Sequence, residues 1–198
     1  MATPPGVVLT RPVGCRGVAT MFPRALDPGD VKSDAELAMF DELEHQLADE
    51  WLAFHSVSWL IRDPGAGAQD GEIDFVVAHP DRAILCLEVK GGKLACHHGR
   101  WKRYQDGEWK NAKDPFAQAL DHRHNLSRLI DTVDGWRGRE LMLVHAVAFP
   151  DTTVEAAMAP DGPREILIDS GAAGRNRAGA RVPPRCAGEA QGAGRGRD

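Results

Sequence analysis

The stretch that decides the fold is IDFVVAHPDRAILCLEVKGG, from Ile73 to Gly92. It contains two short apolar runs, IDFVVA and AILCLEV, separated by the residues from His79 to Arg82. Apolar runs of this length on either side of a Pro-Asp turn are typical of two strands joined as a hairpin. The stretch therefore predicts a β-hairpin whose second strand ends at the glycine pair that follows Lys90.

Three charged residues interrupt these apolar runs. Asp74 lies in the first predicted strand, Glu88 in the second, and Lys90 at the end of the second. Charged residues are depleted in strands, and a buried charge is costly unless it is paired or binds a metal. We therefore expect these three side chains to compensate one another or to hold an ion.

The length of the hairpin loop decides whether the three side chains meet. Side chains alternate between the faces of a strand, so Glu88 and Lys90 share one face, and Asp74 joins them only if the loop has an odd number of residues. A three-residue loop from Pro80 to Arg82 places Asp74 opposite Glu88, with Cβ atoms about 5 Å apart. Carboxylates this close should raise one pKa or bind a divalent cation.

These residue types suit phosphodiester hydrolysis. Mg²⁺ binds one or two carboxylates and keeps its other positions for water and phosphate oxygens. The cation acts as a Lewis acid and activates water, and an ammonium group such as that of Lys90 stabilises the developing charge. The alternative is structural: an ion pair between strands, or charges that protect an edge strand from aggregation.

The hairpin resembles the core motif of the nuclease-related domain (NERD) family, a branch of the PD-(D/E)xK nuclease-like superfamily. The resemblance covers about Ser33 to Val133. It implies a restriction-endonuclease-like α/β/α core with a mixed β-sheet, in which Asp74, Glu88 and Lys90 are catalytic. It also implies Mg²⁺ or Mn²⁺, with Asp74, Glu88 and the backbone carbonyl of Val89 as ligands.

The resemblance implies two further site residues, each with an ordinary alternative. A preceding helix in the superfamily often supplies a Glu, for which Glu36 in SDAELAMFDEL is the candidate; with Ser33 it also forms a capping-box pattern. A Gln in the helix after the hairpin also recurs, and KDPFAQALDH presents Gln118, which could equally be a solvated helix residue.

The flanking sequence predicts the order of the other elements. We expect the following: a helix from Ser33 to about Trp51, a strand over 51–61, a loop up to Glu72, polar strands over 93–113, a helix from Asp114 to about Asp134, and strands from Glu140 and Arg164. This order indicates one α/β domain over residues 33–170, with disordered segments at 1–32 and 171–198.

Composition bounds the function. The 198 residues are 42% hydrophobic and carry a net charge of −5, which argues against a protein that coats nucleic acid through overall charge. No apolar run approaches the roughly 18 residues of a membrane-spanning helix. The four cysteines are scattered and indicate no disulfide framework, so we expect a cytoplasmic protein.

Two other motifs allow more than one interpretation. The segment 101–110 interleaves basic and aromatic residues, which indicates either a nucleic-acid-binding surface or an aromatic core beneath a solvated basic hairpin. His122 and His124 are two residues apart and point to different faces of the predicted helix, so they do not favour a zinc site.

The sequence thus predicts a metal-dependent nuclease that cleaves DNA in DNA processing. One alternative is a catalytically silent nucleic-acid-binding or regulatory module that works with a helicase-like partner. The other is a small α/β protein whose charged strand residues are structural.

Overall fold

A mixed sheet of six strands forms the centre of the protein, which is represented by a computed structural model. The structure describes residues 18–27, 29, 31, 33–63, 65, 67–153 and 162–170. The strand order is β1-β2-β3-β4-β8-β9, where β2–β3 and β3–β4 are antiparallel and the other pairs are parallel. The strands are β1 (Thr20–Phe22), β2 (Leu52–Asp63), β3 (Gly67–Ala78), β4 (Ile84–Val89), β8 (Leu143–Phe149) and β9 (Leu167–Asp169).

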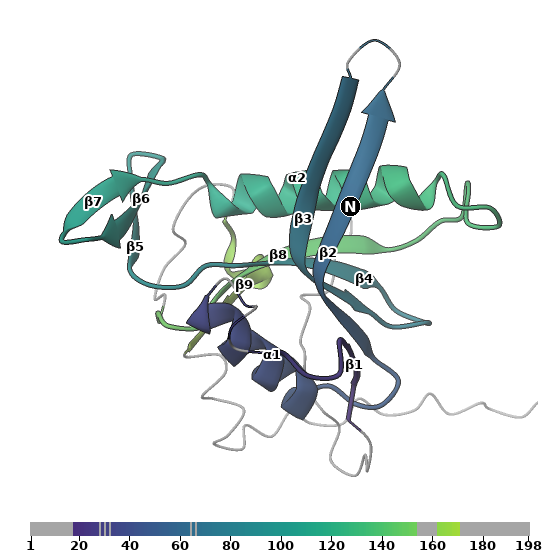
Figure 1. Cartoon of the computed structure of the whole chain (residues 1–198), viewed down its shortest axis with the longest axis horizontal. Helices are drawn as coiled ribbons and strands as arrows, with labels where there is room; N and C mark the ends of the chain where they lie inside the picture. Colours follow the sequence, from purple (N-terminus) through teal and green to yellow (C-terminus); the bar gives the residue numbers. More distant parts are fainter. Residues whose placement is uncertain are drawn as a thin grey trace, which may run out of the picture.

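One helix packs on each face of this sheet (Figure 1). Helix α1 (Asp34–Gln46) buries Met39, Phe40 and Leu43 in a cluster that includes Phe75 and Leu87. Helix α2 (Pro115–Ile130) covers the other face and contacts β4 and β8. The predicted α/β fold with a mixed sheet is confirmed, with α1 and α2 as the outer layers.

A second, three-stranded antiparallel sheet leads into α2. It consists of β5 (Leu94–His97), β6 (Arg100–Gln105) and β7 (Glu108–Asn111). Trp101 of β6 is 3% exposed and packs with Phe116 and Phe149. Tyr104 and Trp109 are exposed and contact each other edge to face. The basic hairpin therefore contributes one aromatic residue to the core and leaves two at the surface.

The hairpin between β3 and β4 has the predicted register. Phe75 pairs with Leu87 and Ala78 with Ile84, and the N–H of His79 donates to the carbonyl of Ala83 at 3.0 Å. Continuing the same register by one residue places Asp74 opposite Glu88. The prediction of a three-residue loop is therefore confirmed, and the fork where β3 leaves β4 lies at Asp74.

Strands β2 and β3 extend beyond the sheet as a two-stranded arm (Figure 1). Instead of the predicted loop up to Glu72, β3 begins at Gly67, because β2 continues to Asp63 and supplies a partner for each residue from Gly67 to Ile73. A Cβ on Gly71 would lie 2.5 Å from the ring of Trp59, so the glycine makes room for the indole. The sequence did not predict this extension, because the segment is rich in Gly and Asp, which are depleted in strands.

The prediction that segment 1–32 is disordered is wrong for residues 20–22, which form a strand. Strand β1 pairs in parallel with β2, from Thr20 beside Leu52 to Phe22 beside Phe54. Met21 is 4% exposed and belongs to the core cluster beneath α1. Pairing and burial by distant residues order this strand, which local composition could not reveal. The predicted tail 171–198 lies outside the described residues.

Other element boundaries differ by a few residues. Helix α1 ends at Gln46 because Leu47 is already extended, and the strand expected from Glu140 begins at Leu143. The segment from Arg164 starts with a 3₁₀ turn, Arg164–Ile166, before β9. Its Arg164 guanidinium binds both carboxylate oxygens of buried Asp169, at 2.8 and 3.1 Å. No helix in the described ranges is long and apolar enough to cross a membrane.

Candidate active site

Glu88 is a buried carboxylate at the end of a central strand. Its exposed fraction is 2%, and β4 is flanked on both sides by β3 and β8. The Nζ atom of Lys90 donates a hydrogen bond to Glu88 Oε1. The backbone N–H of Lys90 donates to the carbonyl of Ala148 on β8 at 2.9 Å. The parallel strand therefore holds the backbone from which both charged side chains extend.

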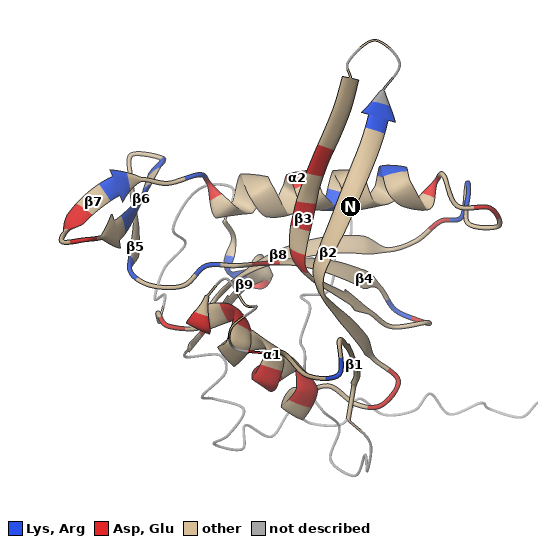
Figure 2. Cartoon of the chain, viewed as in Figure 1, with Lys and Arg blue, Asp and Glu red and all other residues tan. Residues whose placement is uncertain are grey.

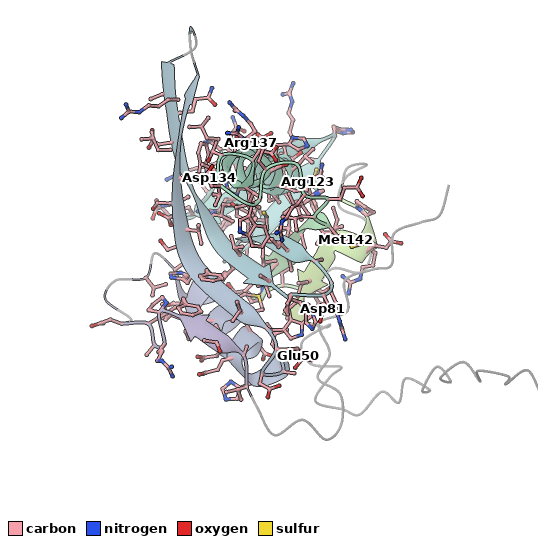
Figure 3. The ribbon with its side chains drawn as sticks, turned by 90° about the vertical axis from the view of Figure 1, so that its right-hand side faces the viewer. Glu50, Asp81, Arg123, Asp134, Arg137 and Met142 are labelled. Atoms are coloured by element: carbon pink, nitrogen blue, oxygen red, sulfur yellow. The ribbon has the colours of Figure 1, made fainter. Side chains whose placement is uncertain are left out.

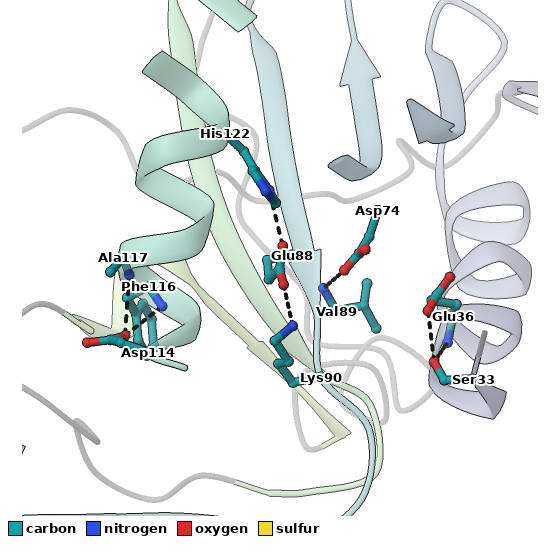
Figure 4. Close-up of polar contacts among 10 residues, drawn as sticks. All are labelled: Ser33, Glu36, Asp74, Glu88, Val89, Lys90, Asp114, Phe116, Ala117 and His122. Atoms are coloured by element: carbon teal, nitrogen blue, oxygen red, sulfur yellow. Dashed lines mark hydrogen bonds and ion pairs between the residues drawn. The ribbon is translucent and has the colours of Figure 1, made fainter. Parts of the chain in front are cut away.

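A histidine from α2 completes the surroundings of Glu88. His122 Nδ1 lies 3.1 Å from Glu88 Oε2 (Figure 4). This is an ion-pair distance, yet the alignment required for a hydrogen bond is lacking, and both atoms are shielded from solvent without another partner among the residues described. One oxygen of Glu88 is thus satisfied by Lys90, while the other has spare capacity to accept.

Opposing effects set the pKa of Glu88. Burial raises it, whereas His122 and Lys90 stabilise the carboxylate and together hold the pKa below its usual value. Glu88 is therefore ionised at neutral pH despite its burial, as a metal-binding or charge-stabilising role requires.

Asp74 brings a second carboxylate to the end of β4. Its Oδ2 accepts a hydrogen bond of 2.8 Å from the backbone N–H of Val89, as Figure 4 shows. Burial and, next, the negative charge of Glu88 raise the pKa of Asp74 to about 6, against smaller opposing effects from Val89 N–H and Lys90. The two acids therefore interact electrostatically across the fork, as the register predicted.

Glu36 lies on the α1 side of this fork and is only 6% exposed. The predicted capping box is confirmed, since Ser33 Oγ donates to Glu36 Oε1 at 3.0 Å and Glu36 N–H donates to Ser33 Oγ at 3.3 Å. Glu36 Oε2 lies 3.1 Å from His55 Nε2 of β2. Both oxygens are thus engaged, while the charge of Glu36 adds slightly to the raised pKa of Asp74.

Gln118 lies in the first turns of α2, near Lys90. Among the described residues, no hydrogen bond joins its side chain to Asp74 or Glu88. Gln118 and Lys90 line a pocket of about 240 Å³ between α2 and the β5–β7 sheet. The structure therefore brings Gln118 into a pocket that it shares with Lys90.

The residues present suit a divalent cation that needs few protein ligands. Glu88 Oε2 is a buried oxygen without an aligned donor, and Asp74 is a neighbouring carboxylate destabilised by negative charge. A cation between them would offset both effects. Within the part of the chain that the structure describes, no group of three or more His, Cys, Asp or Glu side chains is arranged to bind a metal. The pair thus fits Mg²⁺, which retains waters and substrate oxygens, better than an all-protein cage.

A larger and more apolar pocket, of about 590 Å³, lies at the other end of β4. Its lining includes Ile84, at the start of that strand. Glu50, Asp81 and Met142, which are labelled in Figure 3, also line it. Because Glu88 and Lys90 lie at the opposite end of the strand, this pocket is separate from the candidate site.

The α/β core carries Asp74 on one strand and Glu88-x-Lys90 on the next, as the resemblance predicts. A family model described as the nuclease-related domain, NERD, matches residues 32–150. The chain belongs to this family, and the match extends past the expected limit at Val133 to include β8. Neither the curated proteins nor the solved structures contain a significant match.

The sequence did not predict two histidine contacts, that of His122 with Glu88 and that of His55 with Glu36. His122 follows Gln118 by one helical turn and therefore shares its face, a signal that could have placed it at the site. His55 gave no such signal, because its approach to Glu36 depends on how α1 packs across β2.

Proposed function

We propose that this protein is a metal-dependent nuclease that hydrolyses DNA phosphodiester bonds in DNA processing. The observation that carries the proposal is the buried Glu88–Lys90 pair, with the Asp74 carboxylate bound to the intervening Val89 N–H. Membership of the nuclease-related family supports the class of reaction.

Asp74 and Glu88 would hold the cation, Mg²⁺ or Mn²⁺, with the Val89 carbonyl as a third oxygen. When bound, the cation would supply Lewis-acid chemistry at a phosphoryl oxygen. Asp74 must first lose its proton, which its raised pKa permits at neutral pH.

Lys90 would serve as the donor at the reacting phosphate. Its side chain is 16% exposed, and its Nζ contacts Glu88. The same residue lines the pocket beside Gln118. From this position the ammonium group can orient a water molecule or stabilise charge on the phosphate. Gln118 would position the substrate, and Glu36 would help as a further ligand or through a bound water molecule.

A nicking assay tests this function. Purified full-length protein should convert supercoiled plasmid to open circles with Mg²⁺ or Mn²⁺, and EDTA should stop the reaction. Glu88→Gln keeps the shape of the side chain but removes its charge, and it should abolish nicking. Equal nicking by wild type and Glu88→Gln would contradict the proposal.

If the protein binds DNA but does not cleave it with any divalent cation tested, the result would instead favour a catalytically silent nucleic-acid-binding module. In that case the domain would recruit or serve a partner such as a helicase-like protein. The two outcomes are separable because binding can be measured in EDTA.

A further inference from the structure

The pocket between α2 and the β5–β7 sheet adjoins the candidate active site through Lys90. Its lining contains four basic side chains and no carboxylate: Lys90, Arg103, Lys110 and Lys113. Gln118 adds an amide group that can donate a hydrogen bond. A pocket of about 240 Å³ with this lining suits a compact anion.

The strand register explains why the cations gather on one side. Leu94 pairs with Arg103, and Arg103 pairs with Lys110, so all three share the face of the small sheet that carries buried Trp101. Tyr104 and Trp109 pair with each other on the opposite, outer face. The inner face is thus anchored to the core by an aromatic residue and presents positive charge beside α2.

The charge of this region contrasts with the rest of the chain. Residues 90–113 contain seven Lys or Arg against Asp106 and Glu108, a net charge of +5, whereas the whole chain carries −5. Figure 2 shows acidic residues along α1 and on β3, and basic residues on β6 and β7. Attraction of a polyanion should therefore be concentrated at the small sheet.

One ion pair within this region does not neutralise the pocket. Lys110 Nζ lies 2.8 Å from Asp106 Oδ2, but their side chains are 48% and 72% exposed. Exposed pairs of this kind contribute little to stability. An incoming phosphate can therefore replace Asp106 as the partner of Lys110.

We infer that this pocket binds a backbone phosphate of the substrate strand next to the bond that is cut. The inference rests on the proposed nuclease function, since Lys90 would then be shared between the reacting phosphate and its neighbour. Arg103 and Lys110 would hold the neighbouring phosphate, with Gln118 and Lys113 at the start of α2. The small sheet would thereby set the position of the strand relative to Asp74 and Glu88.

Arg103 and Lys102 provide a matched test because they are adjacent on β6 and point to opposite faces. Binding of a fluorescein-labelled single-stranded oligodeoxynucleotide to the full-length protein would be followed by anisotropy in EDTA over a range of salt concentrations. We expect Arg103→Gln to weaken binding about tenfold and to reduce the salt slope by about one. Lys102→Gln should change binding less than about threefold, and circular dichroism should show both variants folded.

Three results would each overturn the inference that this pocket binds a backbone phosphate. They are equal effects of the two variants, an unchanged affinity in Arg103→Gln, and no binding by the wild type at low salt. Inorganic phosphate should compete only weakly, because it makes a single contact where the strand makes several; competition by phosphate as strong as by unlabelled strand would point to a free-anion site and also overturn it. Failure of the nuclease assignment would look different. It would leave Arg103-dependent binding intact while plasmid nicking showed no dependence on Glu88.

Discussion

The ammonium group of Lys90 is hydrogen-bonded to the carboxylate of Glu88, two residues earlier in the chain. Glu88 is 2% exposed, so this ammonium group is a principal counter-charge for a carboxylate removed from water. The same lysine reaches the basic pocket. A single residue thus links the stability of the buried acid to the surface where substrate would arrive.

Lys90→Ala should therefore affect both reaction and folding. We expect plasmid nicking to fall at least about 10²-fold, because a donor to the developing charge is lost. Stability should fall by up to about 3 kcal/mol, since a buried carboxylate loses its partner. Initial nicking rates and urea unfolding measure these effects. Lys93→Ala is the control, because Lys93 lies over the exposed Tyr104 ring instead; similar losses in both variants would argue against a special role for Lys90.

Asp74→Asn should stabilise the protein at neutral pH while removing activity. The folded protein holds the pKa of Asp74 at about 6 against an ordinary 3.8, so ionised Asp74 costs up to about 3 kcal/mol above pH 6. The Asn side chain can still accept the Val89 N–H bond. Urea unfolding across pH 4 to 7 should show wild-type stability falling as pH rises through this range, because the folded state binds the extra proton. The same pH profile in Asp74→Asn would contradict the assignment.

The same pKa predicts how metal binding depends on pH. Affinity for Mn²⁺ should drop as pH falls through about 6, because protonation removes one ligand. Calorimetric titration of Mn²⁺ at several pH values would show this. An affinity independent of pH between 5 and 7 would indicate that Asp74 is not a ligand.

His122→Ala should weaken metal binding without removing a ligand. His122 lies 3.1 Å from Glu88 Oε2 and helps to keep that carboxylate ionised. Loss of such supporting partners typically costs about 10- to 100-fold in metal affinity. Mn²⁺ titration measures this effect. His124→Ala is a matched control, since the exposed His124 contacts Arg123 instead, and an equal loss there would contradict the role of His122.

Gly91→Ala should disturb the site by pushing α1 away. A Cβ at Gly91 would lie 2.7 Å from the Cβ of Ala35, which is buried and cannot rotate aside. Such overpacking typically costs about 1–3 kcal/mol. Thermal unfolding of Gly91→Ala, Ala35→Gly and the double variant tests the contact. The double variant should be more stable than the sum of the single effects predicts; simple additivity would show that the two residues do not clash.

The features predicted correctly were those that local rules determine. The odd-length loop determined the register of Asp74 against Glu88, and the pairing of Ser33 with Glu36 determined the start of α1. Both depend on residues close together in the chain, where side-chain alternation and capping leave few choices.

The features missed depend on residues that are distant in sequence. Strand β1 is ordered by β2, about thirty residues later, and the arm exists because each strand supplies hydrogen-bond partners for the other. The contact of His55 with Glu36 likewise requires α1 to lie across the sheet. Hydrophobic periodicity carries no information on such pairings.

Asp74, Glu88 and Lys90 all belong to one hairpin, closed by the three-residue turn from Pro80 to Arg82. Bringing them together requires little loop-closure entropy, whereas burying them requires α1 and α2 to dock from distant parts of the chain. Partial unfolding that releases the helices would therefore leave the three residues as neighbours but return them to water, where the pKa values of Asp74 and Glu88 would be ordinary. In this protein, the proximity of the charged groups is determined locally, whereas their burial, which shifts the pKa values of Asp74 and Glu88, depends on the cooperative packing of the fold.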